Sequence, residues 1–357
     1  MGKKATFYLL YNLSILGTVL LAVLAFGGRV AVHSDPAEYP LVTFWGLALS
    51  AILPANLLLA VYWLVRRKIW VVVPLLALAL NWTYVSDFYR ISFSGAEDAQ
   101  PRFRVATLNS HAFRMGNYEG VVRETAHFFN RRQADIVCLQ EFVPASKYGL
   151  DSIAVDFGFL PHVYHPLDHR GISELTVFSR YPITDCGFIP FRDSDNSALW
   201  IDVTVDGRKL RVLTAHLQTT GVSSARGQLN RQSGNIEGQT AVLNSMSDRI
   251  LENARMRAEQ VRILRRIIDT TTCALVVCGD FNDTPASYTY GMMKGRLTDG
   301  FHSNGSGFGA TFRELHNLLR IDFILYNDKL KGVSYDSPDA PFSDHRPVIM
   351  GFDFRDE

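Results

Sequence analysis

Cysteine is scarce in this chain, and the few cysteines present are not arranged for cross-linking or for zinc. The 357 residues include four, Cys138, Cys186, Cys273 and Cys278. Their number and spacing do not form a disulfide framework, and no Cys-His spacing typical of structural zinc accompanies them. Cys138 and Cys278 lie in apolar, strand-like runs, where a small buried thiol is the simplest explanation. The sequence therefore excludes a disulfide scaffold and a zinc finger.

Excess charge of either sign is also missing. The chain has 36 Lys and Arg against 35 Asp and Glu, and 7 of the basic and 5 of the acidic residues precede residue 101. The remainder thus carries 29 basic and 30 acidic residues. A protein that holds polyanions through its overall charge is strongly basic. Composition gives no support for a general nucleic-acid binder.

Long apolar runs, by contrast, crowd the first quarter of the chain. They cover about residues 6–26, 41–65 and 69–85, and each approaches the roughly 20 residues that cross a bilayer. A cleaved signal peptide would explain only the first run. We expect a membrane segment over residues 1–90 with three transmembrane helices, a polar linker over 91–101 and a soluble domain over 102–357.

Basic residues predict the orientation of this segment. Lys3 and Lys4 precede the first run, and Arg66-Arg67-Lys68 separates the second from the third. The positive-inside rule places both in the cytoplasm. Three crossings then put residues 102–357 outside, which predicts a multi-pass protein of the cytoplasmic (inner) membrane whose soluble domain is extracytoplasmic. The lipid bilayer is a predicted partner, and no obligate protein partner is evident.

The soluble domain mixes strand and helix patterns. Helical periodicity covers residues 119–132 and again the stretch up to about 269, where the arginines, Arg257 among them, are expected on the solvent face. A polar insertion, 218–247, precedes the second helix, and Asp206-Gly207 predicts a hairpin turn. The predicted strands are 103–109, 135–141, 174–182, 197–205, 209–214, 274–280, 320–326 and 348–354.

Polar side chains recur where these strands end. In Gly279-Asp280-Phe281-Asn282 a buried strand ends on a carboxylate and an amide, although such a pattern alone is most often a turn. Acidic, amide and imidazole groups at oxygen-rich sites suit a hard cation such as Mg²⁺ or Mn²⁺ better than zinc. The set comprises Asn109, Glu141, His216, Asp280, Asn282, Asp322, Asp344 and His345.

The ordered series resembles the endonuclease/exonuclease/phosphatase superfamily, which includes DNase I-like nucleases, abasic-site endonucleases, neutral sphingomyelinases and inositol-polyphosphate 5-phosphatases. The resemblance covers about residues 102–356 and leaves out the membrane segment. It implies an α/β (α+β) fold, a four-layer α/β/β/α sandwich of two mixed sheets with the site at one edge. The motifs are Leu108-Asn109, Leu139-Gln140-Glu141, Ala215-His216-Leu217, Gly279-Asp280-Phe281-Asn282, Ile321-Asp322-Phe323 and Ser343-Asp344-His345.

The resemblance also implies a metal-dependent hydrolase of phosphate esters. Glu141 would be the main metal ligand, with Asn109 and Asp344 beside the ion. Asp280 would orient or deprotonate the attacking water, and Asn282 would hold a phosphoryl oxygen.

Two histidines complete the implied set. His345 would contact the phosphate, its tautomer fixed by Asp322. His216 would protonate the leaving oxygen, as in DNase I-like enzymes and sphingomyelinases, where abasic-site endonucleases tend to have Tyr. A Glu supports this His in those relatives, and Glu174 is the local candidate, although the match around Gly171-Ile172-Ser173 is loose.

Three functions fit these residues. The first is hydrolysis of a phosphodiester or phosphomonoester, in a lipid headgroup or a small molecule outside the membrane, which the near-neutral charge slightly favours. The second is an anchored endonuclease acting on extracytoplasmic nucleic acid, for which a basic cleft would be expected. The third is an inactive scaffold, which is disfavoured because every catalytic residue type is present.

Overall fold

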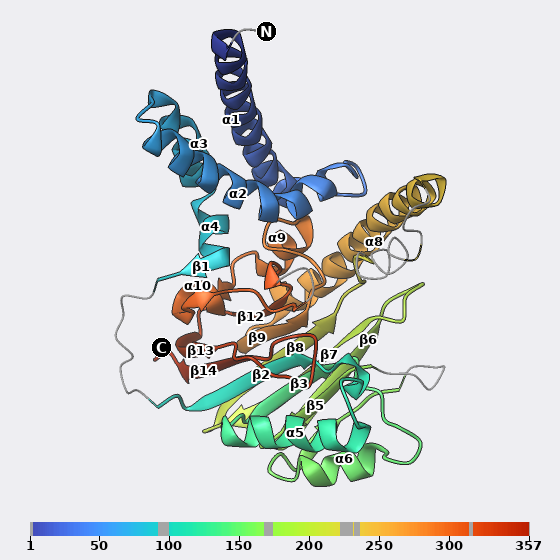
Figure 1. Ribbon diagram of the computed structural model, residues 1–357. Helices are drawn as coiled ribbons and strands as arrows, with labels where there is room; N and C mark the ends of the chain where they lie inside the picture. Colours follow the sequence, from blue (N-terminus) through green and yellow to red (C-terminus); the bar gives the residue numbers. More distant parts are fainter. Residues whose placement is uncertain are drawn as a thin grey trace.

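A helical N-terminal unit stands on a domain of two stacked β-sheets (Figure 1). The computed structural model describes residues 3–91, 100–167, 174–221, 231, 236–313 and 317–356. Most of the predicted linker 91–101 and much of the predicted insertion 218–247 lie outside these ranges.

Each sheet has six strands, and both are mixed, as the fold class requires. One sheet has the order β10-β12-β9-β8-β7-β6 and the other β13-β14-β2-β3-β5-β4. Each contains one parallel pair at its centre, β8 with β9 and β2 with β3, and antiparallel pairs elsewhere. The strands are β2 (Phe103–Asn109), β3 (Ile136–Gln140), β4 (His162–Tyr164), β5 (Thr176–Ser179), β6 (Ile183–Pro190), β7 (Ser197–Val205), β8 (Arg208–His216), β9 (Ala274–Asp280), β10 (Thr298–Asp299), β12 (Asp322–Tyr326), β13 (Leu330–Asp336) and β14 (Val348–Phe354).

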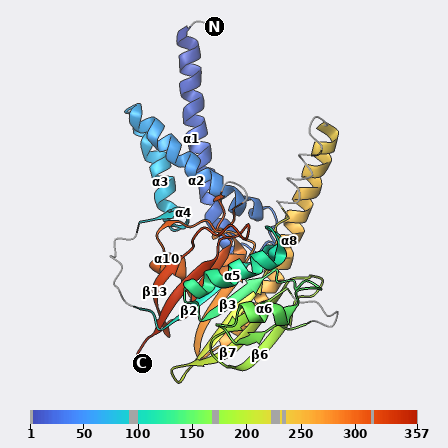
Figure 2. The same cartoon turned by 60° about the horizontal axis from the view of Figure 1, so that its bottom comes forward.

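Helices cover the outer face of each sheet, so the predicted four-layer sandwich is confirmed (Figures 1 and 2). One outer layer lies over β2 and β3, and the other lies over β8 and β9. The outer helices are α5 (Tyr118–Arg131), α6 (Leu150–Asp156), α8 (Ile236–Thr270) and α9 (Tyr288–Lys294), while η2 (His111–Phe113) and α10 (Gly300–Asn304) lie in connections.

Alternation along the strands creates three apolar layers. In β2, Phe103 and Val105 face the opposite sheet, whereas Ala106 and Leu108 face α5. This is the two-residue period of a strand buried on both faces. The Asp206-Gly207 hairpin is also confirmed, since both residues have positive φ, 48° and 78°, as a tight primed turn requires.

The N-terminal unit contains two helices that are long and apolar enough to cross a membrane, α1 (Lys3–His33) and α2 (Val42–Val65). Many of their side chains are exposed in the isolated chain, and the apolar ones include Leu16, Leu58 and Leu64. Length and composition therefore suggest association with a membrane.

The predicted third transmembrane helix, residues 69–85, is wrong as a single span. The segment is divided into η1 (Ile69–Val71), α3 (Val72–Leu80) and α4 (Trp82–Phe88). The break falls at Asn81, whose φ and ψ of −106° and 25° are not helical. At about 1.5 Å per residue, the apolar stretch Ile69–Leu80 is far shorter than a bilayer core of about 30 Å.

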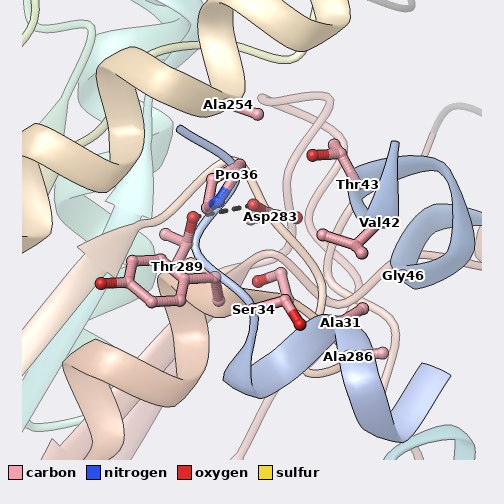
Figure 3. Close-up of a pocket in the computed structure, with 12 residues that line it drawn as sticks. Ala31, Ser34, Pro36, Val42, Thr43, Gly46, Ala254, Asp283, Ala286 and Thr289 are labelled. Carbon is pink, nitrogen blue, oxygen red and sulfur yellow. Dashed lines mark hydrogen bonds between the residues drawn. The ribbon is translucent and has the colours of Figure 1, made fainter. Parts of the chain in front are cut away.

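The helical unit touches the sheet domain closely at two glycines. A Cβ on Gly46 of α2 would lie 2.5 Å from the carbonyl oxygen of Ala286, and one on Gly291 of α9 would lie 2.9 Å from Val32. Figure 3 shows this junction around a small cavity of about 20 Å³, with Thr289 donating a hydrogen bond to Asp283. Arg262 of α8 adds an ion pair with Asp35.

A buried ion-pair cluster forms the second junction. Arg320, just before β12, is paired with Asp87 of α4 and, at 2.9 Å, with Asp299. His302 lies 2.7 Å from the same Asp87. Two short strands, β1 (Tyr89–Arg90) and β11 (Gly307–Phe308), pair beside this cluster. Because breaking a buried pair leaves an uncompensated charge, this cluster ties α4 firmly to the sheet domain.

We expect Gly46→Ala to separate the two units. The added methyl group meets backbone that cannot rotate away, so the variant should lose about 1–3 kcal/mol of stability, seen as a lower thermal midpoint of the detergent-solubilised chain. Gly17→Ala is the matched control, because nothing lies within 4 Å of a Cβ there and Ala favours a helix. Equal midpoints for the two variants would contradict the close packing.

Candidate active site

Strand pairing brings the predicted site residues to one edge of the sandwich. In the first sheet, His216 pairs with Asp280 across β8 and β9, and Asp280 pairs with Asp322 across β9 and β12. In the second sheet, Asn109 ends β2 beside Gln140, so Glu141 follows directly. The strands β12 and β14 run antiparallel to β9 and β2, which is why their first residues meet the last residues of those strands.

Asn109 joins the two sheets at this edge. Its Nδ2 donates to Oε1 of Glu141 and to Oδ2 of Asp280, each at 3.0 Å. Its Oδ1 accepts a hydrogen bond from the backbone N–H of His111. One amide thus sets the separation of carboxylates that belong to different sheets.

His216 is held by a carboxylate, and that carboxylate is Glu174. Nδ1 of His216 lies 2.9 Å from Oε1 of Glu174, while its Nε2 lies 3.8 Å from Oδ2 of Asp280. Burial lowers the pKa of His216, but Glu174, Asp280 and Glu141 together raise it to about 9. The imidazole is therefore a positively charged group with one N–H facing the site.

His345 repeats this arrangement from the other side. Its Nδ1 lies 2.9 Å from Oδ2 of Asp322, and its Nε2 lies 3.9 Å from the same Oδ2 of Asp280. Burial lowers its pKa, and the Asp322 and Asp280 carboxylates raise it to about 10. Two histidines, each held by its own carboxylate, thus face one oxygen of Asp280.

Asp280 itself is only 1% exposed. Burial and the negative charge of Asp322 raise its pKa, and His345 and His216 oppose this, leaving it at about 6. A carboxylate with a pKa in this range can accept a proton near neutral pH.

Asn282 is placed beside Asp280 by a tight turn. Its φ is 52°, its backbone N–H donates to Oδ1 of Asp280 at 2.8 Å, and its Nδ2 donates to the carbonyl oxygen of Leu217 at 2.9 Å. The side-chain amide is therefore held at the site's rim by the end of β8.

Comparison with known proteins agrees with this geometry. Residues 107–345, more than half of the chain, match the Endonuclease/Exonuclease/phosphatase family. The chain belongs to this family. Residues 10–88 match a second family, a domain of unknown function (DUF8431). No curated protein matches the chain significantly.

Several solved structures share the endonuclease/exonuclease/phosphatase fold. A humanized TDP2 from D. rerio has a TM-score of 0.52 at 16% identity, over 70% of this chain and 98% of that one. A family member from Bacteroides vulgatus has a TM-score of 0.50 at 17% identity, over 71% and 99%. D. rerio TDP2 complexed with single strand DNA product has a TM-score of 0.50 at 14% identity, over 70% and 98%. At these identities the likeness concerns the fold alone.

The family depends on divalent metals, and the site has the groups to hold one. Glu141 keeps 35% of its side chain exposed. Burial raises the pKa of Asp344, and the negative charge of the nearby Glu141 adds to this rise. Oδ1 of Asp322 is buried without a hydrogen-bond partner within the described residues. A cation would compensate this concentration of carboxylates.

Two His-carboxylate clusters in the described part of the chain are compact enough to hold an ion. Asp280, Asp322 and His345 form one, within the site. The other, Asp87, Asp299 and His302, already surrounds the Arg320 guanidinium. That charge occupies the place a metal would need, so the second cluster is structural.

Some neighbours of the site carried no signal in the sequence. Asn196 donates to Oε1 of Glu174 at 3.2 Å, and His111 lies 3.2 Å from Asp344. Asn196 is an isolated polar residue just before β7, and nothing around it in the sequence indicates a site. His111 comes two residues after Asn109, and this position is the only signal that could have indicated it.

The expectation that the arginines of this helix face solvent is wrong for Arg257. It is fully buried, with Nε 3.1 Å from Asp283 and Nη1 2.9 Å from the carbonyl oxygen of Gln218. The helix α8 also begins at Ile236, earlier than predicted. Arg257 therefore anchors the loop that follows Asp280, a role that helical periodicity could not distinguish from solvation.

Behind the site, Gln140 links the sheets through hydrogen bonds. Its Nε2 donates to the hydroxyl oxygens of Thr107 on β2 and Thr214 on β8, each at 3.0 Å. Gln140 and Thr214 are both fully buried. Since Glu141 comes next in the chain, this bond helps to keep the two halves of the site together.

We expect Thr214→Val to lower stability by about 1–2 kcal/mol, because it removes one partner of a buried amide while keeping the shape of the side chain. Denaturant unfolding measures the change. Thr204→Val, at an exposed position of the neighbouring strand β7, should be neutral or stabilising. Equal effects of the two substitutions would mean that the inter-sheet bond contributes nothing.

Proposed function

We propose that the chain is a divalent-metal-dependent phosphoesterase that hydrolyses a phosphodiester, or a phosphomonoester, outside the cytoplasmic membrane. The observation that carries the proposal is the convergence of two carboxylate-held histidines on Asp280: the Nε2 atoms of His216 and His345 lie 3.8 and 3.9 Å from one carboxylate oxygen. Membership of the family supports hydrolysis of phosphate esters.

In the proposed reaction Asp280 takes a proton from water, and the water oxygen forms a bond to phosphorus. The phosphorus–oxygen bond to the leaving group breaks, and that oxygen receives a proton from Nε2 of His216, whose Nδ1 stays on Glu174. His345, oriented by Asp322, donates to a phosphoryl oxygen, and the rim amide of Asn282 orients another.

Glu141 and Asp344 would hold the metal, Mg²⁺ or Mn²⁺, with Asn109 fixing the Glu141 carboxylate through its 3.0 Å hydrogen bond. When bound, such an ion polarises a phosphoryl oxygen and offsets the negative charge that develops on it.

A lipid headgroup is the substrate class that we favour, because α1 and α2 would anchor the site beside a bilayer. An anchored endonuclease is the second candidate. One protein with the same fold, D. rerio TDP2, is complexed with single strand DNA product, which supports this alternative. The balanced charge of residues 101–357, however, offers little counterion release.

We expect the full chain to hydrolyse bis-p-nitrophenyl phosphate only with Mg²⁺ or Mn²⁺. Asp280→Ala and His345→Ala should each lower kcat by at least about 10²-fold, since each removes a proton-transfer or charge-stabilising group. Release of nitrophenolate is measured.

Exposed residues of the same types give the controls for this assay. Asp328→Ala and His127→Ala, both on the surface, should leave kcat unchanged. Activity that survives in Asp280→Ala and His345→Ala, or that persists in EDTA, would refute the site or the metal requirement.

The proposed sidedness has support in the arrangement of the helices. The start of α1 and the turn that follows α2 lie at the end of the helical unit that points away from the sheet domain (Figure 1). In the sequence, the start of α1 carries Lys3 and Lys4, and the turn carries Arg66 to Lys68. The segments η1, α3 and α4 lead the chain back from that turn. Cytoplasmic placement of the basic residues would therefore leave the sheet domain outside.

A reporter that works only outside the cytoplasm should be active when fused after residue 357 and silent when inserted after Arg67, because the proposed topology puts the sheet domain outside and the basic turn that follows α2 inside. Enzymatic activity of the reporter in intact cells is the measurement. The reverse pattern, or silence at both points, would mean that the domain faces the cytoplasm.

A further inference from the structure

A large, mostly apolar cavity lies between the helical unit and the sheet domain. Its volume is about 1120 Å³, slightly more than the roughly 300–1,000 Å³ of typical ligand sites. On one side it is lined by α2 and α4, including Leu49, Leu53 and Trp82, and on the other by Leu318 and Arg346 of the sheet domain.

The cavity and the candidate active site share two loops. Thr284, Pro285 and Ala286 line it and follow Asn282 after one residue, while Arg346 lines it and directly follows His345. The same two loops therefore present catalytic side chains at one end and cavity surface at the other.

Arg346 provides a positive charge in the cavity wall, directly after the site residue His345. Its Nε is buried without a hydrogen-bond partner among the described residues, and it is 3.7 Å from Asp339, which is 71% exposed and already bonded to Arg313 at 2.6 Å. Arg320, also in the lining, is neutralised by Asp87 and Asp299. Arg346 is thus the better-placed group for an anion.

The cavity is also bordered by groups that suit contact with a bilayer. The helix α2, of membrane-crossing length, forms one wall. Trp82, Tyr89 and Phe308 border the cavity and remain 69%, 50% and 75% exposed, and the rings of Tyr89 and Phe308 meet at 5.0 Å across β1 and β11. Exposed aromatic rings are typical of the membrane–water interface.

We propose that this cavity receives the acyl chain of a membrane lipid whose phosphate ester is hydrolysed at the Asp280 site. The inference rests on the proposed function and deepens it by assigning a binding place to the acyl chain of the lipid substrate. The apolar walls bury the chain, Arg346 attracts the phosphate, and the shared loops guide it to His345. A nucleic acid would leave this apolar surface unused.

The test compares two phosphodiesters with the same leaving group, p-nitrophenyl decyl phosphate and p-nitrophenyl methyl phosphate, on the full chain in nanodiscs. Leu57 of α2 lines the cavity, so Leu57→Trp should fill part of it. The next residue, Leu58, does not line the cavity, and Leu58→Trp is the matched control. Both leucines are exposed, 55% and 70%. The decyl ester partitions into the nanodiscs to the same extent with each variant, so partitioning does not affect the comparison between them.

Leu57→Trp should lower kcat/KM for the decyl ester by about tenfold or more, the effect expected when two or more methylene groups can no longer be buried. Because the methyl ester has no chain to bury, its kcat/KM should fall much less, so that the decyl-to-methyl ratio falls. Leu58→Trp should match the unsubstituted protein on both esters. If Leu57→Trp retains the decyl-to-methyl ratio, or if DNA is hydrolysed and the decyl ester is not preferred, the cavity is not a lipid site although the phosphoesterase proposal stands.

If neither ester is hydrolysed, the proposed function fails, and a cross-linking experiment decides the cavity separately. A benzophenone amino acid at Leu318, which lines the cavity from the sheet domain, should capture nanodisc lipid on illumination, and Leu57→Trp should reduce this capture. The same probe at Val155, an exposed residue of α6, should not capture lipid. Absence of lipid capture at Leu318 would overturn the cavity proposal.

Discussion

The candidate site depends on one buried carboxylate held between two charged imidazoles. Asp280 has almost no contact with solvent, so its negative charge is stabilised by Asn109 and by His216 and His345 rather than by water. Each imidazole is in turn held by a second carboxylate, Glu174 or Asp322. Such a network is stable only when every member is present, because a lone buried charge is costly.

The scaffold supports this network through bonds between layers. Asn109 at the edge and Gln140 behind it connect the two sheets, and Arg257 holds the loop that carries Asp283. The helical unit is attached through Arg320, which pairs with Asp87 of α4 and lies two residues before Asp322. The candidate site and the N-terminal helices are therefore parts of one packed structure.

Several parts of this structure could be predicted because their signals are local. The strands with alternating or continuous apolar residues, the α5 helix and the Asp206-Gly207 turn follow from periodicity and turn chemistry. Two expectations failed, one at a local helix break and one where tertiary contacts decide. Residues 69–85 are apolar enough to span, yet Asn81 ends the helix. Arg257 has the spacing of a solvated residue, yet Asp283 and Gln218 draw it into the core.

The sequence by itself determined which chemical groups stand at the strand ends, because their order along the chain identifies the family before any coordinates are known. Only the tertiary structure decided what those groups do to one another. Charges interact over a few ångströms, and residues as distant in sequence as Asn109 and Asp280 come within 3.0 Å only when β2 and β9 are stacked. The cavity beside the site is likewise a property of packing, since α2 and the loop before β14 form it together.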